Sequence, residues 1–481
     1  MLKSRRMDFA GRLSALVVVA VAAPSAASAQ AGNDAVPTFV EVAPILQARC
    51  ETCHRAGSIG PMALTSYEDA RRYASTIRRK VTAGEMPPWH LDKSIGIQDF
   101  KNDISLSDQE IETLVRWVDG GTPMGDPARF PAPRDWGDFD SAWEYEAHFG
   151  RPPDLVIASP TYLVPANELD QWPQLAVDVG LEAPRWVRGV EVRPADPETR
   201  YVFHHANPAV RQPSGGYGLG QASAGTVGYI FPDDTGQLLE PEAKITWAMH
   251  LFPIERDVEA TLQLGIWLYP EGVTPEFVTP GEVIYEASQS TGFGHEAQPA
   301  SLALVAEDRG DGGGRGGVST EPQFPRQADL LIPPNSVVTY RGVYVMDKPA
   351  RIFSIRGHMH LRGRHQVLEV IYPDGRWEVL NKLDWDHRWQ TAFLYEDWAM
   401  PLLPKGTVVL VTNIFDNTVN NPRNPAPDQW AVRGERTIDE MSHTRLGINF
   451  FDREEDFERL VREREQLLAE RRGVPVAAAR R

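Results

Sequence analysis

The pattern of apolar and polar residues differs between the first quarter of the chain and the rest. Ser107 is followed three positions later by Glu110, and apolar residues then recur at helical spacing as far as Gly120. This pattern predicts a helix that begins with a capping box. From about residue 154, apolar and polar residues alternate in short runs, as in 261–268 and 366–372. Alternation between turn residues predicts antiparallel β-sandwich architecture, and the length of the region predicts two sandwiches.

The N-terminus and the composition constrain location and partners. Basic residues, an apolar run over roughly 13–23 and the sequence Ala27-Ser28-Ala29 predict a cleaved secretory signal over residues 1–29, and therefore a periplasmic protein. The run is too short for a membrane span, and we expect no span later in the chain. The net charge of −17 argues against nucleic acid as a partner.

The chain has only two cysteines, and both lie in the motif Cys50-Glu51-Thr52-Cys53-His54. Thiols three positions apart on a helix face one edge of a porphyrin, and the histidine that follows can bind the iron. The motif therefore predicts covalent attachment of a c-type haem. The alternative is a disulfide between Cys50 and Cys53 beside a chance histidine.

A second ligand of the haem iron is expected further along the chain. Met86, followed by two prolines, is the predicted ligand, and Met62 and His90 are the alternatives. An iron held by His54 and a methionine suits electron transfer. Residues 35–125 thus resemble a small class I-like cytochrome c, which implies a small all-α domain. A proline-rich linker over residues 126–153 follows.

Histidines in the second region have spacings that suit metals. His358 and His360 are two apart in an apolar run, so on a strand both imidazoles point the same way. With a thioether from Met441 they form a set that favours a soft ion, with Cu(I) as the first choice. His204 and His205 are adjacent and point to opposite faces of a regular strand. They can share an ion only where the strand bulges or twists.

His250 completes a set of three imidazoles with His204 and His205, which suits copper, with zinc as the competitor. Three further histidines are interpreted as structural: His365, His387 and His443.

The order of these motifs, His-His, His, His-x-His and Asp-Glu-Met, resembles the copper type II ascorbate-dependent monooxygenases. This is the family of peptidylglycine α-hydroxylating monooxygenase and dopamine β-monooxygenase. The similarity covers roughly residues 150–450, including Ser354-Ile-Arg-Gly-His-Met-His and the approach to Met441. The context of His250 keeps only part of the family pattern, and this chain lacks the disulfides of the animal enzymes.

The resemblance implies two copper ions and two jelly-roll sandwiches, over residues 154–328 and 329–451. The dense alternation of charges that follows predicts a charged helical tail over 452–481. One ion, the electron-supplying copper, would be held by His204, His205 and His250. The other, the oxygen-activating copper, would be held by His358, His360 and Met441.

Two arginines are candidates for substrate binding. Arg356 lies two positions before His358, where peptide-hydroxylating members of the family grip a substrate carboxylate. Arg445 stands where those members have a tyrosine, so the resemblance implies a different substrate. The alternative is that both arginines pair with nearby carboxylates.

The resemblance implies a copper-dependent monooxygenase that hydroxylates a C–H bond of a small organic substrate with O₂. We expect the fused haem c to deliver the electrons, which it takes from an external donor. The alternatives are a non-catalytic electron-transfer or copper-binding protein and a zinc hydrolase. The absence of an obvious catalytic carboxylate beside His-x-His argues against the hydrolase.

Overall fold

The computed structural model describes residues 35–56, 58–134, 143–223, 226–287, 298–299, 330–434 and 436–471. The predicted signal over residues 1–29 lies outside them. Strands dominate the described chain, and the described residues from 37 onward form one compact unit. None of the described helices has the length and apolar character needed to cross a bilayer.

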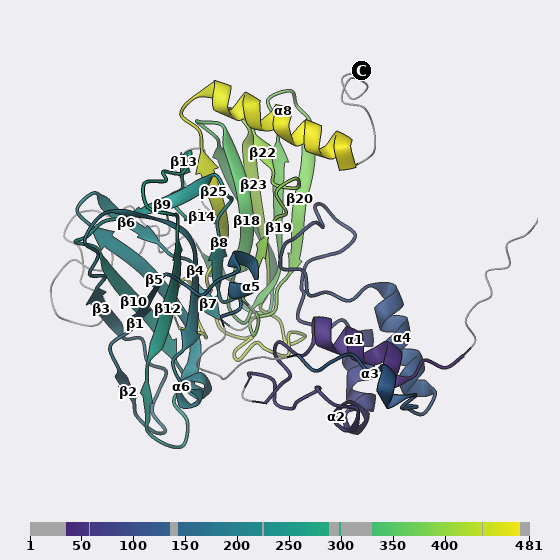
Figure 1. Ribbon diagram of the computed structural model, residues 1–481. Coiled ribbons are helices and arrows are strands. Elements are labelled where there is room, and N and C mark those ends of the chain that lie inside the picture. Colours follow the sequence, from purple (N-terminus) through teal and green to yellow (C-terminus); the bar gives the residue numbers. More distant parts are fainter. Residues whose placement is uncertain are drawn as a thin grey trace, which may run out of the picture. The chain divides into compact units, whose positions relative to one another are not determined.

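Four helices near the N-terminus share a core of their own (Figure 1). They are α1 (Phe39–Arg49), α2 (Tyr67–Arg72), α3 (Ala74–Thr82) and α4 (Asp108–Asp119). Capping boxes start two of them, one at Thr38 and one at Ser107, because each hydroxyl accepts a backbone N–H and a glutamate three residues on reciprocates. Leu46, Leu114 and Trp117 are almost completely buried in this core.

Two sheets form the first sandwich. The order of one is β1 (Leu155–Ala158), β12 (Leu262–Leu268), β4 (Arg185–Pro194), β9 (Thr235–Leu239) and β13 (Phe277–Val278), with β8 (Gly228–Ile230) on β4. The order of the other is β3 (Gln174–Asp178), β10 (Lys244–Leu251), β5 (Phe203–Gln212) and β6 (Gly215–Gly218), with β7 (Ala222–Ser223) on β5. Alternate residues of β4 and β10, among them Val190, Ile245 and Trp247, are buried in the shared core.

The second sandwich is built in the same way. One sheet runs β15 (Gln298–Pro299), β14 (Glu282–Glu286), β25 (His443–Phe450), β18 (Ala350–His358) and β21 (Ala392–Leu394), with β22 (Leu402–Leu403) on β18. The other runs β17 (Val337–Val345), β23 (Val408–Asp416), β19 (Gly363–Ile371) and β20 (Trp377–Asp384). Strand β14 pairs with β25 although the sequence places it before the second sandwich. Two short pairs add β2 (Tyr162–Val164) to β11 (Val258–Ala260) and β16 (Leu331–Ile332) to β24 (Ala431–Val432).

Four further helical segments complete the described chain. They are the 3-10 turn Pro127–Arg129, α5 (Glu146–Phe149), α6 (Pro197–Val202) and α8 (Glu454–Arg471), and α8 is the longest helix among the described residues. In the predicted linker, Phe149 stacks on Trp267 with ring centroids 4.9 Å apart. In the predicted tail, α8 buries Phe457 and Leu460 against Phe451.

The predicted fold class is wrong in one respect: residues 35–125 are not a separate all-α domain. The chain between α3 and α4 leaves the helices and pairs with the second sandwich, through bridges from Leu91 to Leu383 and from Phe100 to Tyr395. The Ile97 N–H also donates to the Leu380 carbonyl at 2.8 Å. The physical reason is a set of large apolar side chains in this segment. Trp89, Leu91 and Phe100 bury themselves in the sandwich core rather than among the helices.

Replacing Trp89 tests whether this segment belongs to the sandwich core. Its ring meets Phe393 edge-on with centroids 4.7 Å apart and is 8% exposed. We expect Trp89→Ala to lower the free energy of unfolding by about 3–5 kcal/mol, as loss of a buried aromatic side chain does. Urea denaturation measures this. Trp377→Ala is the control, since Trp377 is 58% exposed on β20. Equal, small losses in the two variants would contradict the packing described here.

Candidate metal centre

The first histidine set lies where β5 pairs with β10. His205 stands opposite His250, but the next pair along is Leu251 with Phe203, so His204 is an extra residue in a bulge. A bulge turns one side chain of the strand toward the other face. As a result, the three rings form an almost equilateral triangle. Their centroids lie 5.1 Å apart for His204 and His205 and 5.0 Å apart for each of the other pairs.

This triangle fits a metal ion. Imidazoles that share a tetrahedral ion, with metal–nitrogen bonds of about 2.0–2.1 Å, have ring centroids about 5 Å apart. One ligand nitrogen from each of the three residues lies within 4.8 Å of the others. The distances between the three rings therefore allow His204, His205 and His250 to bind one ion.

Neighbouring side chains hold the rings of this set. His250 Nε2 lies 3.1 Å from an Asp170 carboxylate oxygen, so a proton donated there leaves Nδ1 free for an ion. Trp172 stacks on His250 with centroids 4.7 Å apart, and Phe252 stacks on His204 at 4.4 Å. Asp170 could not be predicted from local patterns, because it lies in a loop 80 residues before its partner.

The second set lies at the end of β18. His358 Nε2 is 3.2 Å from Met441 Sδ, and the rings of His358 and His360 have centroids 5.3 Å apart. His358 Nδ1 is 2.9 Å from Gln390 Oε1, which can only accept. Donation to Gln390 leaves the lone pair of His358 on Nε2, beside the thioether. The predicted ligands His358, His360 and Met441 are therefore brought together.

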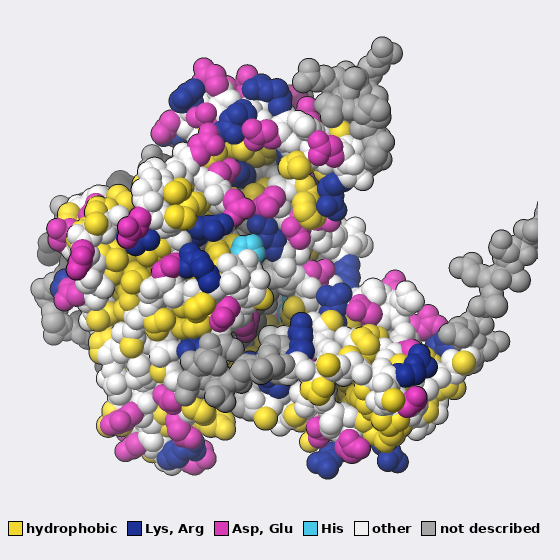
Figure 2. Space-filling view, viewed as in Figure 1, with side chains coloured by type: hydrophobic (Ala, Val, Ile, Leu, Met, Phe, Trp, Pro, Cys, Tyr) yellow, Lys and Arg dark blue, Asp and Glu magenta, His cyan; other side chains and the backbone are white. Residues whose placement is uncertain are grey.

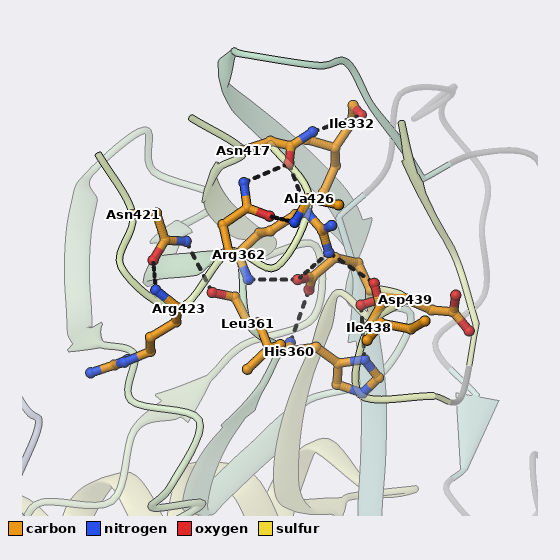
Figure 3. Close-up of polar contacts among 12 residues, drawn as sticks. Ile332, His360, Leu361, Arg362, Asn417, Asn421, Arg423, Ala426, Ile438 and Asp439 are labelled. Atoms are coloured by element: carbon orange, nitrogen blue, oxygen red, sulfur yellow. Dashed lines mark hydrogen bonds and ion pairs between the residues drawn. The ribbon is translucent and has the colours of Figure 1, made fainter. Parts of the chain in front are cut away.

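His360 is oriented by the Asp-Glu-Met segment itself (Figure 3). Its Nδ1 lies 3.2 Å from the Asp439 carbonyl oxygen, an obligatory acceptor, so Nε2 carries the lone pair. Glu440 is fully buried and accepts the backbone N–H groups of His360 at 2.9 Å and of Arg362 at 2.7 Å. Glu440 thereby connects the segment before Met441 to the residues that follow β18.

Arg362 reinforces this connection. Its Nη1 donates to the Ile438 carbonyl at 2.9 Å and its Nε donates to Asn417 Oδ1 at 2.8 Å (Figure 3). The importance of Glu440 and Arg362 was missed at the level of sequence, although Glu440 lies within the motif that identifies Met441.

The histidines of both sets are held in the neutral form. Burial lowers the pKa of His204 to about 3 and that of His360 to about 4, and neighbouring imidazoles add to both effects. Burial also places the pKa of His205 and of His358 well below the usual range. On the face of the molecule that Figure 2 shows, only a small spot of histidine surface is visible. Neutral imidazole is the form that binds metals, so no proton has to be displaced at neutral pH.

The two sets come close to each other at the contact between the sandwiches. His387 lies between them, with its ring centroid 5.9 Å from that of His204 and 6.3 Å from that of His360. In the same contact, the hydroxyls of Ser223 and Thr226 donate to the Gln390 carbonyl at 3.4 and 3.2 Å. The two sets therefore form one buried group of imidazoles rather than two isolated sites.

Both candidate substrate arginines face a carboxylate instead. Arg356 is 0% exposed and binds Glu282 through two hydrogen bonds, one of them 3.0 Å from Nε to Oε1. Arg445 Nη1 lies 3.7 Å from the same carboxylate, and Tyr229 from the first sandwich donates to it. These two cations lower the pKa of Glu282 despite its burial. The structure thus shows the alternative interpretation, in which both arginines pair with a nearby carboxylate.

The predicted haem-attachment residues lie after α1. Cys50 and Cys53 are free thiols and are not joined by a disulfide. His54 Nδ1 lies 3.0 Å from the Met62 carbonyl, which leaves Nε2 available for an iron. A side chain at Gly60 would lie 2.6 Å from the Cys53 carbonyl and 2.7 Å from His54 Nδ1, so the chain passes closely over the motif. These contacts fit an axial role for His54.

The three candidates for the second axial ligand have different surroundings. Met62 packs against the helical core, and its carbonyl already holds His54. His90 Nε2 lies 3.9 Å from Asp386, and its backbone carbonyl accepts the Asp384 N–H at 2.7 Å. Met86 is half-buried just after α3 and remains the predicted ligand.

Comparison with known proteins identifies no family. Neither a family model nor a curated protein matches the chain. A mutant of Bacillus subtilis oxalate decarboxylase is 10% identical over 55% of this chain and 77% of its own, with a TM-score of 0.12. Pumpkin pro-11S globulin is 9% identical over 69% and 94%, with a TM-score of 0.14. Paenibacillus xanthan lyase is 9% identical over 68% and 27%, with a TM-score of 0.15. Similarity this low supports no conclusion about function.

The depressed pKa of His360 predicts acid sensitivity of the metal-free protein. Below the ordinary histidine pKa of 6.5, unfolded chains take up a proton at this position that the folded chain refuses until about pH 4. Stability is therefore lost as the pH falls. Between pH 7 and pH 5, we expect the free energy of unfolding to fall by about 2 kcal/mol less in His360→Gln than in the wild type.

Urea denaturation at the two pH values measures this difference. His365→Gln is the control, since His365 is partly exposed on β19 and lies outside both sets. An equal drop in the wild type and in His360→Gln would show that the folded protein does not hold His360 neutral.

Proposed function

We propose that this chain is a periplasmic copper-dependent monooxygenase that hydroxylates a C–H bond of a small organic substrate, with electrons delivered through a fused c-type haem. The observation that carries the proposal is the pairing of two different donor sets, three imidazoles and two imidazoles with a thioether, within one buried group. The reaction would consume one O₂, two electrons and two protons, and it would yield the alcohol and one water.

The two donor sets suit different tasks. The thioether of Met441 beside His358 favours the reduced, softer state of copper, which is the state that binds O₂. The set of His204, His205 and His250 offers nitrogen only, which serves both oxidation states and suits electron relay. Copper, when bound, would supply the one-electron redox chemistry and the activation of O₂.

The protein residues around the sets prepare them for this role. Gln390 and the Asp439 carbonyl fix the tautomers of His358 and His360, so both lone pairs are directed before an ion arrives. Burial excludes water and keeps the imidazoles neutral. Because Glu440 ties His360 to the Met441 segment, the distance between imidazole and thioether is held by backbone hydrogen bonds.

The haem would be attached through Cys50 and Cys53, with His54 and Met86 as axial ligands. Residues 89–100, which follow Met86 closely, pair with β20 and with Tyr395 after β21. The chain between β20 and β21 carries His387 and Gln390, which contact the histidine sets. This connection supports a haem that passes electrons, received from an external donor, to the metal centre.

One observation favours a second candidate, a non-catalytic copper-binding or electron-transfer protein. The cavity lined by Gly357, Trp385 and Thr391, beside the histidine strand, holds about 10 Å³. That is about the space of one water molecule, too little for an organic substrate. A carrier needs no larger space than this. In a monooxygenase the substrate would have to approach from another side, such as that of the half-buried Met441.

Oxygen-isotope labelling separates the two candidates. The copper-loaded protein, supplied with a reductant and ¹⁸O₂, is incubated with a panel of small organic compounds, and products are examined by mass spectrometry. We expect one ¹⁸O atom in a product, and a loss of at least about tenfold in Met441→Leu, since even outer-shell changes cost about 10–100-fold. Labile copper and no labelled product with any compound would favour the carrier.

Replacing Met86 tests the role of the haem. We expect Met86→Leu to slow repeated turnover, because the iron would lose its predicted ligand and its high potential. A single turnover of protein whose copper has been reduced beforehand should be unchanged, because it needs no transfer from the haem. Stopped-flow O₂ consumption measures both. Equal loss of both activities would show that Met86 acts in some way other than electron supply.

A further inference from the structure

His387 occupies a position that neither histidine set explains. It belongs to the loop between β20 and β21, in the second sandwich, yet its nearest imidazole is His204 of the first, with centroids 5.9 Å apart. Its Nδ1 is buried and has no hydrogen-bond partner among the described residues. The unprotonated nitrogen of a neutral imidazole carries a lone pair, and a nitrogen without a protein partner can offer that lone pair to an ion.

The first set has room for a further donor. Three imidazoles leave the fourth position of a tetrahedral ion open. The ring of His387 is only slightly further from His204 than the three rings of the set are from one another, 5.9 Å against 5.0–5.1 Å. The ligand nitrogens that lie mutually close belong to His204, His205 and His250 and do not include His387. The imidazole of His387 would therefore have to turn toward the ion to occupy the open position.

We propose that His387 is a further ligand of the ion held by His204, His205 and His250, supplied by the other sandwich. The proposal rests on the metal of the proposed function but not on its reaction. It makes the first ion a link between the two sandwiches, because three of its ligands come from β5 and β10 and the fourth from the loop after β20.

The same loop also holds both histidines of the second set. Gln390 accepts from His358 at 2.9 Å, and Trp385 Nε1 donates to the His360 carbonyl at 2.9 Å. An ion that holds His387 in place would therefore also hold Trp385 and Gln390, which flank it in the loop and orient His360 and His358. Filling the first set should tighten binding at the second, and by linkage the reverse holds as well.

The loop is already anchored at its start, so His387 is presented on a defined backbone. Asp386 accepts from Arg388 at 2.6 Å and from Arg423 at 2.9 Å. The ion pairs hold Asp386, the residue before His387. The Nδ1 atom of His387 itself has no hydrogen-bond partner among the described residues.

The test isolates the first set. In the full chain with His358→Gln and His360→Gln, Cu(I) is titrated against a chromophoric chelator, and the imidazoles bound per copper are counted by X-ray absorption. Adding His387→Ala should weaken copper binding by at least about tenfold, because loss of a residue that only supports a ligand already costs about 10–100-fold in affinity. It should also remove one imidazole from the number bound per copper. Adding His365→Ala instead is the control and should change neither.

An unchanged affinity and an unchanged imidazole count in His387→Ala would overturn the proposal. If the doubly substituted parent does not fold, the same count is made on the otherwise wild-type chain with and without His387→Ala, and one imidazole fewer is again expected. A chain that loses an imidazole with His387→Ala but incorporates no ¹⁸O would refute the proposed monooxygenase and leave the role of His387 intact.

Discussion

A buried imidazole must give its one N–H to an acceptor, and the choice of acceptor decides which nitrogen is left for an ion. This constraint governs the candidate centres. Asp170 faces Nε2 of His250, whereas Gln390 faces Nδ1 of His358 and the Asp439 carbonyl faces Nδ1 of His360. Because desolvation keeps the buried rings neutral, each set is ready to bind without losing protons.

The fold supplies these acceptors from distant parts of the chain. Glu440, buried between two backbone N–H groups, brings the Asp439 carbonyl to His360 and Met441 to His358. Burial raises the pKa of Glu440 to about 7, and the hydrogen bonds from Arg362 and His360 oppose that rise. At the contact between the sandwiches, Glu282 plays a comparable part, since Arg356, Arg445 and Tyr229 all converge on it. Both carboxylates work through burial and multiple donors rather than through exposure to substrate.

Local patterns in the sequence predicted what depends on local geometry. The two-residue spacing brings the rings of His358 and His360 to a centroid distance of 5.3 Å, although β18 ends at His358 and His360 lies just beyond the strand. The adjacency of His204 and His205 required the bulge that is observed opposite His250. The capping box at Ser107 is also present. The prediction of a separate all-α domain was wrong because the burial of Trp89 and Phe100 depends on Phe393 and Tyr395 in the second sandwich, about 300 residues further along the chain. The positions of Gln390 and His387 had no local signal for the same reason.

The ratio of copper to haem in the mature protein tests the central claim most directly. The protein is produced in a host that attaches c-type haem, loaded with copper and dialysed, and both cofactors are quantified. Two tightly held coppers per haem are predicted, because two oriented, neutral donor sets accompany one Cys50–Cys53–His54 motif. One copper or none per haem would contradict the account, since at least one set would then be a histidine cluster without a metal.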